Sequence, residues 1–418
     1  MSSFEKERPG VPIGSGATAS AGRKIRLAYV VTHPIQYQAP LLRYLAAQDD
    51  IDLMVYFQSD FSRQTYFDRD FGREIAWDVP LLQGYRWEVL PAVGPTDRLD
   101  SLYPLNYGII SRLWRGQYDF LWVHGYSRWL NWLAIGVARL RGCKVLIRDD
   151  ATALSARRSS IKIWAKRRLF FPLLSSLIDG FLAAGSLNRA YCLENGIPED
   201  RLFLMPYAVD NDYFAAGAER AAERREAFRA ELGLEPGRPV ILFAGKFLQL
   251  KRPYDLLEAF IRLLPELPVR PYLLFAGDGV LAEGLKARAG EVSGDVRFLG
   301  FRNQSELSAY YDLCSVFVLP SEFETWGLAV NEAMSVGRAV VVSDRVGCGA
   351  DLVQPGINGH VFPCGDVSAL AAALADILRS PERAEQMGRA SREIVHTSWS
   401  FRENLAALRS AMDRLRRK

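Results

Sequence analysis

Two glutamates eight positions apart carry the most specific chemical signal in the sequence. Glu324 lies in PSEFETW, after the apolar run 315–319, and Glu332 lies in the helical pattern GLAVNEAMSV. One carboxylate is therefore expected in a loop and the other about one and a half turns into a helix. Such a pair can bind sugar hydroxyls at one end of a ligand and a ribose diol at the other. Taken alone, a solvated loop residue and an exposed helix residue explain the spacing as well.

The residues between the two glutamates are expected at the N-terminus of that helix. They are Thr325, Trp326, Gly327 and Leu328. Free backbone N–H groups and the helix dipole favour an anion there. Gly327 also lets a ligand approach the backbone closely.

Two lysines follow another apolar run, 239–245. Lys246 comes directly after Gly245, and Lys251 follows five residues later. Two cations beyond the carboxyl end of a strand suit a diphosphate, which gains charge as a sugar leaves. Either lysine alone is as readily a solvated surface residue. The later turn 277–279 (Gly-Asp-Gly) lacks the third glycine of a dinucleotide fingerprint, so a simple strand-to-helix turn remains an alternative for it.

The elements that position these residues form two similar halves. Short apolar runs alternate with helical patterns from Lys24 onward, which indicates parallel sheets covered by helices. The expected strands are 25–31, 51–57, 119–125, 144–149, 179–185 and 201–207, then 239–245, 271–277, 295–300, 315–320 and 338–344. The pattern predicts two doubly wound, Rossmann-like α/β domains facing across a cleft, with ligands beyond the carboxyl ends of the strands.

Changes in composition give the expected boundaries. Residues 1–23 are rich in Gly, Ser, Ala and Pro and are expected to be a disordered leader. The first domain is expected over 24–207 and the second over 239–399. The Ala-, Glu- and Arg-rich stretch 208–238 is interpreted as a helical linker between them.

Composition excludes several classes of protein. The 52 Lys and Arg residues against 48 Asp and Glu leave a net charge of +4, too balanced for a protein that coats nucleic acid. No run of 18 apolar residues is present to span a bilayer. The five cysteines are far apart and form no CxxC pair, which favours reduced, buried thiols in a cytoplasmic enzyme.

In the segments that contain the two glutamates and the two lysines, the second half of the sequence resembles the retaining glycosyltransferases of family 4, which have the GT-B fold. The segments occur in the family's order and are GKFLQLKRPYDLLEAF (245–260), LLFAGDGV (273–280), VRFLGF (296–301), PSEFETWGLAVNEAM (320–334) and SDRVGCGADLVQPGINGHVF (343–362). The segment 397–412 resembles the family's closing helix. The resemblance therefore implies that a helix over about 400–418 crosses back to the first domain.

The resemblance implies a role for each matched residue. Glu324 would contact the donor sugar, and Glu332 would bind the ribose hydroxyls of a nucleotide. Lys246 and Lys251 would hold the diphosphate and act with Glu324 in catalysis. The turn 299–302 would lie beside the base. The implied donor-binding residues are Glu332, Thr325, Trp326, Gly327, Leu328, Gly245, Gly277, Asp278, Phe301 and Arg302.

No metal and no other cofactor is implied, because lysines and a helix N-terminus take the place of the metal. The triplet Asp68-Arg69-Asp70 looks like a metal-binding DxD motif. It lies in an irregular aromatic stretch of the other domain, so we do not expect it to bind a metal.

The first half departs from the family pattern. His33 stands where many members have a glycine-rich loop, and Arg148, Asp149 and Asp150 stand where many have a sugar-contacting histidine. His124 follows the expected strand 119–123. All five are candidate contacts to the acceptor or the sugar, with a structural role as the alternative for the histidines.

Two further stretches concern the acceptor. The stretch 151–178 has interleaved aromatic residues, no acid, and the basic residues Arg157, Arg158, Lys162, Lys166, Arg167 and Arg168. Its part 157–178 is interpreted either as a membrane-surface helix that reaches a lipid-linked acceptor or as a solvated helix packed on the core. The loop 58–77 carries five aromatics, which either stack on sugars or form a local cluster.

The predicted function is transfer of a sugar, with retention, from a UDP- or GDP-sugar to a hydroxyl acceptor. The family's habit implies a glycan or lipid-linked oligosaccharide as acceptor, in polysaccharide biosynthesis. The expected place is the cytoplasm, including the inner face of the membrane, and no nucleic acid is expected as a partner. The alternatives are another GT-B enzyme, such as a nucleotide-sugar epimerase or a phosphorylase, and a catalytically silent scaffold.

Overall fold

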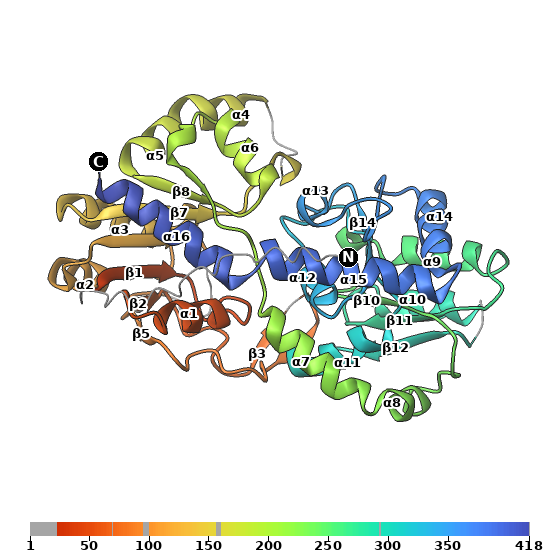
Figure 1. The fold of residues 1–418 in the computed structure, drawn as a ribbon. Coiled ribbons are helices and arrows are strands. Elements are labelled where there is room, and N and C mark those ends of the chain that lie inside the picture. The colour runs from red at the N-terminus through yellow and green to blue at the C-terminus, as the bar shows by residue number, and fades with distance from the viewer. Residues whose placement is uncertain (1–22, 69, 95–99, 156–159, 292–293, 418) are drawn as a thin grey trace, which may run out of the picture.

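The computed structural model describes residues 23–68, 70–94, 100–155, 160–291 and 294–417. Two parallel sheets with covering helices form two domains that lie side by side (Figure 1). The α/β architecture predicted from the alternation of apolar runs and helices is confirmed. The expected leader lies outside the described residues, apart from Arg23.

The first sheet is all-parallel and has seven strands. Its strands, in spatial order, are β5 (Arg86–Val89), β2 (Ile51–Phe57), β1 (Ile25–Val31), β6 (Phe120–His124), β7 (Lys144–Asp149), β8 (Gly180–Ala183) and β9 (Leu202–Leu204). Its helices are α1 (Ala39–Ala46), α2 (Gly108–Gly116), α3 (Trp129–Leu140), α4 (Ser160–Ala165), a π-helical turn (Lys166–Phe170), α5 (Phe171–Leu177) and α6 (Ser186–Glu194).

The second sheet is also all-parallel and has six strands. They are β12 (Val296–Gly300), β11 (Tyr272–Ala276), β10 (Val240–Ala244), β13 (Val316–Leu319), β14 (Ala339–Ser343) and β15 (Gly359–Phe362). The helices of this half are α7 (Asn211–Ala222), α8 (Arg225–Glu231), α9 (Pro253–Leu263), α10 (Ala282–Gly290), α11 (Gln304–Leu313), α12 (Leu328–Ser335), α13 (Gly349–Leu352), α14 (Val367–Leu378) and α15 (Pro381–Ser398). Continuous apolar strands such as VILFA and AVVVS are what a sheet buried on both faces requires.

Strand β1 shows how the first core is divided. Leu27 and Val31 lie on one face of the sheet, in a cluster with α1 and α16 (Phe401–Arg416). Ala28 and Val30 lie on the other face, in a cluster with α2, α3 and α5. The change of face at every residue follows from the two-residue period of a strand.

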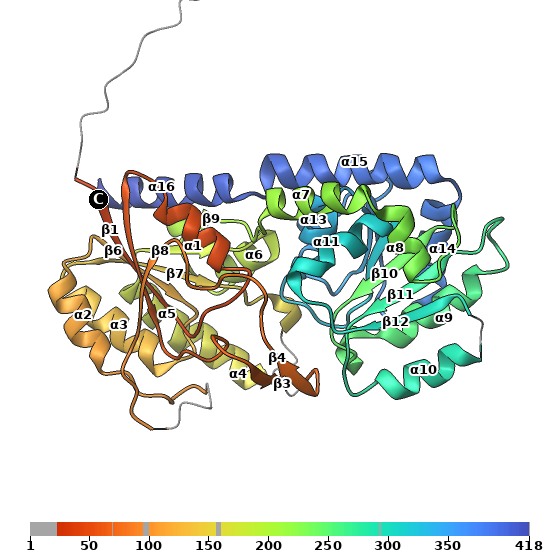
Figure 2. The same cartoon turned by 90° about the horizontal axis from the view of Figure 1, so that it is seen from below.

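Helix α16 returns the chain to the first domain, as the resemblance implied. Figure 2 shows α15 over the second domain and α16 over the first, running one after the other along the same side of the molecule. The apolar face of α16, which includes Leu405, Leu408 and Met412, is buried in the core of the first sheet. The first domain is thus built from both ends of the chain.

The stretch interpreted as a linker, 208–238, is not a free connection. Its helices α7 and α8 both pack on α11, so this stretch is part of the second domain. Asp210 caps α7 by accepting a hydrogen bond from the Tyr213 amide at 3.0 Å. The change in composition marked two surface helices of the second domain.

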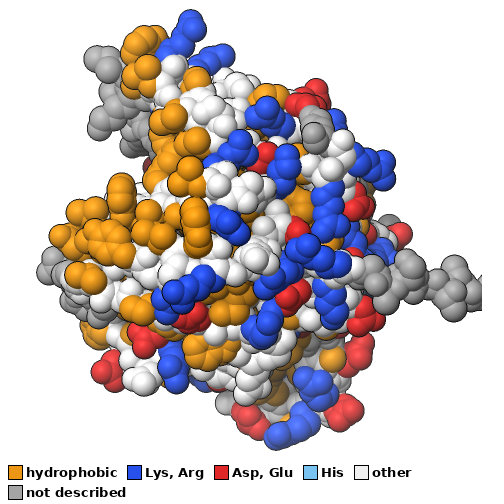
Figure 3. Space-filling view, turned by 90° about the vertical axis from the view of Figure 1, so that its left-hand side faces the viewer, with side chains coloured by type: hydrophobic (Ala, Val, Ile, Leu, Met, Phe, Trp, Pro, Cys, Tyr) orange, Lys and Arg blue, Asp and Glu red, His pale blue; other side chains and the backbone are white. Residues whose placement is uncertain are grey.

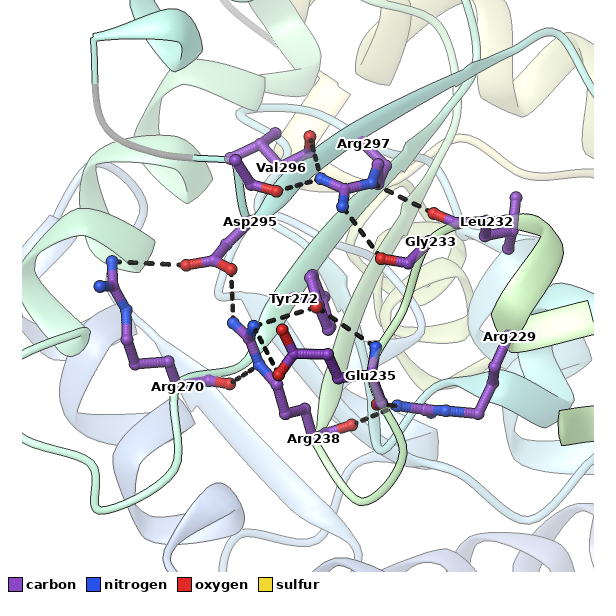
Figure 4. A network of polar contacts seen from close by, with 11 residues as sticks. Arg229, Leu232, Gly233, Glu235, Arg238, Arg270, Tyr272, Asp295, Val296 and Arg297 are labelled. Carbon is purple, nitrogen blue, oxygen red and sulfur yellow. Dashed lines mark hydrogen bonds and ion pairs between the residues drawn. The ribbon is translucent and has the colours of Figure 1, made fainter.

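A network of arginines fixes the entry of the chain into β10 (Figure 4). The Arg238 guanidinium lies 3.8 Å from the centroid of the Tyr272 ring and donates to the Asp295 carboxylate at 2.5 Å. Arg229 donates to the carbonyl oxygens of Glu235 and Arg238 at 2.7 and 2.8 Å. These bonds satisfy backbone carbonyls that a turn would otherwise leave unpaired.

Four strands were missed by the sequence analysis. They are β5, β15 and the antiparallel hairpin β3 (Tyr66–Asp68) with β4 (Arg73–Ile75). All four are three or four residues long and carry charged, polar or glycine residues, so they lack the apolar run that marked the other strands.

No helix within the described ranges is both long and apolar enough to cross a membrane. All five cysteines are free, and four of them are buried, while Cys364 is half-buried. The expectation of buried thiols therefore holds for all but Cys364.

We predict that Leu408→Ala destabilises the first domain selectively. Leu408 is fully buried against the first sheet, and truncation of such a residue costs about 2–5 kcal/mol. Hydrogen exchange read by mass spectrometry should show lost protection in β1 and β2 and unchanged protection in β10. Leu140→Ala is the matched control, because Leu140 is 79% exposed. Unchanged protection in β1 would contradict the placement of α16.

Candidate functional site

The site lies where the carboxyl ends of β10, β11 and β13 meet the first domain. Two pockets open there, and both are lined by residues of both domains. Ala244, Gly245 and Ala329 line both pockets, so the pockets adjoin. This is the edge at which open α/β sheets bind ligands.

The first pocket has a volume of about 150 Å³, and Glu332 is among the residues that line it. The Glu332 carboxylate accepts a hydrogen bond from the Tyr311 hydroxyl at 2.8 Å. Burial raises the pKa of Glu332 to about 7, although the hydrogen bond opposes this shift. Phe301 and Arg302, the predicted base contacts, line the same pocket.

The second pocket has a volume of about 310 Å³ and contains the charged groups. Lys251 forms an ion pair with the Glu324 carboxylate. Thr325 and Leu328 line the pocket at the start of α12. Across the cleft lies Asp150 of the first domain, so a ligand here meets a lysine, two carboxylates and the N-terminus of a helix.

Glycine is required where the two strand ends come together. Gly277 has φ +148°, and a Cβ atom at this position would lie 1.8 Å from the carbonyl oxygen of Gly245. The two turns therefore touch through their backbones, and both line the first pocket. The neighbouring Asp278 lines neither pocket among the described residues, and its carboxylate accepts a hydrogen bond from the Gly279 amide at 2.9 Å. In this structure Asp278 therefore stabilises the turn, and its contact to the donor stays a prediction.

Lys246 does not line either pocket in this structure. Its ammonium lies 3.1 Å from the Asp68 carboxylate and 2.9 Å from that of Asp70, both from the β3–β4 hairpin. Burial lowers the pKa of Lys246, and the hydrogen bonds to Asp70 and Asp68 outweigh it and raise the pKa overall. Asp68 and Asp70 thus bind a lysine of the other domain. Within the described ranges, no three His, Cys, Asp or Glu side chains are grouped as metal ligands.

The helix begins later than expected, at Leu328. Gly327 precedes it with φ +102°, so Thr325 and Trp326 lie in the loop before the helix. The Trp326 indole donates to Asn331 at 2.8 Å, and its ring packs 5.2 Å from that of Trp399. Trp326 borders the second pocket, but its side chain is a core residue between the domains.

Arg148, Asp149 and Asp150 stand where many members of the family have a histidine. Of these three, only Asp150 is among the described residues that line the second pocket. Arg148 is buried and donates to the carbonyl oxygens of Met205 and Pro206, both at 3.1 Å, so its predicted sugar contact is wrong. Asp149 lines neither pocket and caps its own turn by accepting from the Ala151 amide at 2.9 Å, and burial, with the charge of Asp150, raises its pKa to about 6.

Neither histidine is among the described residues that line the two pockets. His33 Nδ1 lies 2.9 Å from the Thr32 hydroxyl, and burial lowers the pKa of His33 to about 4. His124 Nδ1 lies 3.0 Å from the Tyr29 hydroxyl, and burial together with the nearby Arg148 lowers its pKa to about 3. The alternative of a structural role fits both side chains.

Several of the described residues that line the pockets were missed by the sequence analysis. Phe71, Trp77 and Gln304 line the first pocket, and Tyr37 lines the second. Phe71 and Trp77 lie in the aromatic loop 58–77, whose composition was noted without indicating this position. No spacing in the sequence connects that loop to Phe301, more than 200 residues away.

Comparison with known proteins identifies the architecture. Residues 224–394 match the family model described as "Glycosyl transferases group 1". A glycosyltransferase from Rickettsia africae superposes with a TM-score of 0.70 at 14% identity, over 94% of this chain and 98% of its own. Anabaena HepE, solved in complex with UDP and glucose, superposes with a TM-score of 0.67 at 15% identity, over 92% and 99%. The chain has the GT-B fold.

Curated relatives match part of this GT-B chain. The D-inositol 3-phosphate glycosyltransferase of Streptomyces avermitilis is 36% identical over 66% of this chain and 61% of its own length. The protein of the same name from Segniliparus rotundus is 29% identical, over 55% and 50%. The sulfoquinovosyl transferase of Arabidopsis thaliana is 33% identical, over 46% and 40%. The chain therefore spans about half the length of these relatives.

We predict that a ligand that places a ribose diol against Glu332 binds this GT-B chain more tightly as the pH rises through 7. A ribose diol donates hydrogen bonds, and the ionised Glu332 carboxylate accepts them more strongly than the protonated acid does. With a pKa of about 7, Glu332 is mostly protonated at pH 6 and mostly ionised at pH 8, so affinity should rise about tenfold between them. Calorimetric titration with a nucleotide sugar, whose diphosphate does not titrate in this range, measures the change.

Glu332→Gln is the test of the cause. This variant should bind the nucleotide sugar more weakly at pH 8 and with no step between pH 6 and pH 8. A tenfold step that persists in Glu332→Gln would assign the titration to another group.

Proposed function

We propose that this protein transfers a sugar from a nucleoside diphosphate sugar to a hydroxyl acceptor with retention of configuration. The observation that carries the proposal is the joining of the two pockets at Gly245. One pocket is mostly apolar and is lined by Glu332, as a nucleoside requires. The other brings Lys251, Glu324 and the start of α12 together, as a sugar diphosphate requires. The names of the curated relatives, all glycosyltransferases, support the same reaction class.

The diphosphate is proposed to lie between Lys251 and the first turn of α12. Negative charge develops on the diphosphate as the bond to the sugar breaks, and groups already in place stabilise it without reorganisation. Glu324 then exchanges its ion pair with Lys251 for hydrogen bonds from the sugar hydroxyls. We propose that these groups make a metal unnecessary.

Asp150 is proposed as the first-domain contact to the sugar or the acceptor. It lines the second pocket opposite Lys251 and Glu324, in the place where the family has its histidine. The acceptor oxygen attacks the anomeric carbon from the face on which the bond to the phosphate oxygen breaks. The acceptor's proton passes to that leaving phosphate oxygen, so no protein base is consumed.

We predict that Lys251→Ala lowers the rate of sugar transfer by about 100-fold or more, because one preorganised charge is removed from the transition state. Nucleotide release from a panel of UDP-, GDP- and ADP-sugars, with and without an acceptor extract, measures the rate. Glu324→Gln should lose activity to a similar extent. Addition of EDTA should leave the wild-type rate unchanged.

Two surface variants serve as matched controls. Lys286 and Glu283 pair with each other on α10 and line neither pocket, so Lys286→Ala and Glu283→Gln should keep full activity. A wild-type protein that neither releases nucleotide nor is thermally stabilised by any donor would favour the silent scaffold. Conversion of the donor without any dependence on acceptor would favour an epimerase.

We also propose that the first domain lies on an anionic membrane, where it would reach a lipid-linked acceptor. Figure 3 shows hydrophobic side chains gathered on the outer side of this domain. The exposed apolar residues on α2, α3 and the α4–α5 segment include Ile110, Trp114, Trp129, Leu140, Ile163, Trp164, Leu169 and Leu173. None of these helices contains Asp or Glu. Exposed rings on a surface with arginines and no acids in its helices fit lipid headgroups and the upper acyl region.

The basic residues noted in the sequence do not all contribute to this surface. Arg167 and Arg168 are exposed. Lys166 points inward and donates to the hydroxyls of Tyr126 and Tyr191 at 3.2 and 2.8 Å. Arg157 and Arg158 lie outside the described residues.

We predict that Trp164→Ala with Leu169→Ser weakens binding to vesicles that contain phosphatidylglycerol. Both side chains are more than half exposed, so their loss removes apolar contact with lipid without opening a core. Flotation with vesicles measures the bound fraction, which should also fall at high salt. Val280→Ser is the control, because Val280 lies on the second domain and is 77% exposed. Equal binding of all three proteins would argue against this surface.

A further inference from the structure

The β3–β4 hairpin of the first domain extends to the first pocket of the second domain. The Phe71 ring meets the Phe301 ring edge-on, with centroids 5.1 Å apart, and the Trp77 ring lies 6.4 Å from Phe301. Phe71, Trp77 and Phe301 all line the pocket. The pocket therefore has aromatic walls contributed by two domains. Apolar cavities of about 150 Å³ bind single aromatic rings.

Polar contacts hold the tip of this hairpin and the chain that follows β4 on the second domain. Asn303 donates from Nδ2 to the carbonyl oxygen of Ala76 at 2.6 Å. The Ser305 amide, in the first turn of α11, donates to the Asp78 carboxylate at 3.3 Å, and the two side chains also hydrogen-bond. At the tip, Lys246 binds the carboxylates described above. Phe71 and Trp77 are thus set in place before any ligand arrives.

A buried amide in the same pocket lacks a partner. Gln304 is only 8% exposed, and its Oε1 has no hydrogen-bond partner among the residues that the structure describes. Buried side-chain amides are nearly always hydrogen-bonded, so an unsatisfied one that lines a cavity indicates a ligand. An amide both donates and accepts, which matches the edge of a nucleobase. A ligand with a flat face and a polar edge satisfies the rings and the amide together.

We propose that Phe71 and Trp77 of the first domain pack on the nucleobase of the donor while Gln304 hydrogen-bonds to its edge. The inference rests on the proposed function and adds to it a first-domain part of the nucleoside site. Stacking on aromatic rings is nearly independent of the base, whereas a hydrogen bond to a buried amide distinguishes one base edge from another. The rings therefore supply affinity, and Gln304 supplies selectivity.

The test is calorimetric titration of UDP, GDP, ADP and inorganic pyrophosphate into the full-length protein. Phe71→Ala and Trp77→Ala should each weaken the preferred nucleotide at least about fivefold and leave pyrophosphate affinity unchanged. Phe67→Ala is the matched control, because Phe67 lies on the same hairpin and is 59% exposed. Gln304→Ala should reduce the difference in affinity among the three nucleotides. Thermal unfolding of each variant verifies that it is folded.

The outcomes separate this inference from the function on which it rests. A wild-type protein that binds none of the three nucleotides overturns the proposed function. A wild-type protein that binds one of them, with unchanged affinity in both ring variants, overturns only the role of the hairpin. An equal loss of nucleotide and pyrophosphate affinity in the ring variants also overturns it, because the rings would then act on the structure of the cleft and not on the base.

Discussion

The chain passes between the domains twice, after β9 and again between α15 and α16. The site depends on how these two crossings are held. Buried amides fix both of them: Asn404 donates to the Pro206 carbonyl at 2.9 Å, and Asn211 donates to the carbonyls of Val395 and Trp399 at 3.1 and 3.2 Å. Arg148 holds the first crossing from the other side. Because these bonds lie in a buried core, breaking one leaves a polar group unpaired, which costs more than a surface bond does. They set how the ends of the two sheets face each other.

With that geometry fixed, the environment of each carboxylate decides its chemistry. Glu332 and Glu324 are the same residue type eight positions apart. Glu332 is buried against Tyr311 with a raised pKa, whereas Glu324 faces the opposite domain in an ion pair with Lys251. Burial without a cation disfavours the charged form of Glu332. The segment around the start of α12 thus presents a buried carboxyl to one pocket and an ion-paired carboxylate to the other.

The hairpin and the two lysines show how the domains share one site. Lys246 and Lys251 were expected to act as a pair on a diphosphate, but in this structure each is bound to a different acid, Lys246 across the cleft and Lys251 within its own domain. A diphosphate that binds both would exchange these carboxylates for phosphate oxygens. Donor binding in the proposed function is therefore coupled to the contact between the domains, because the same ammonium group serves both.

The sequence by itself determined the two parallel sheets and their order along the chain, because continuous apolar strands are local patterns. The return of the last helix to the first domain was implied by the resemblance to the family. The sequence also indicated Glu324 and Glu332, which lie together in the segment 320–334, and Lys251, which lies in the segment 245–260. Only the tertiary structure decided that Asp150 faces the pocket while Arg148 supports a crossing, and that a hairpin of short polar strands meets Phe301. These choices depend on contacts between residues far apart in the chain, and no local pattern encodes which of two adjacent side chains points into a cleft that both domains form.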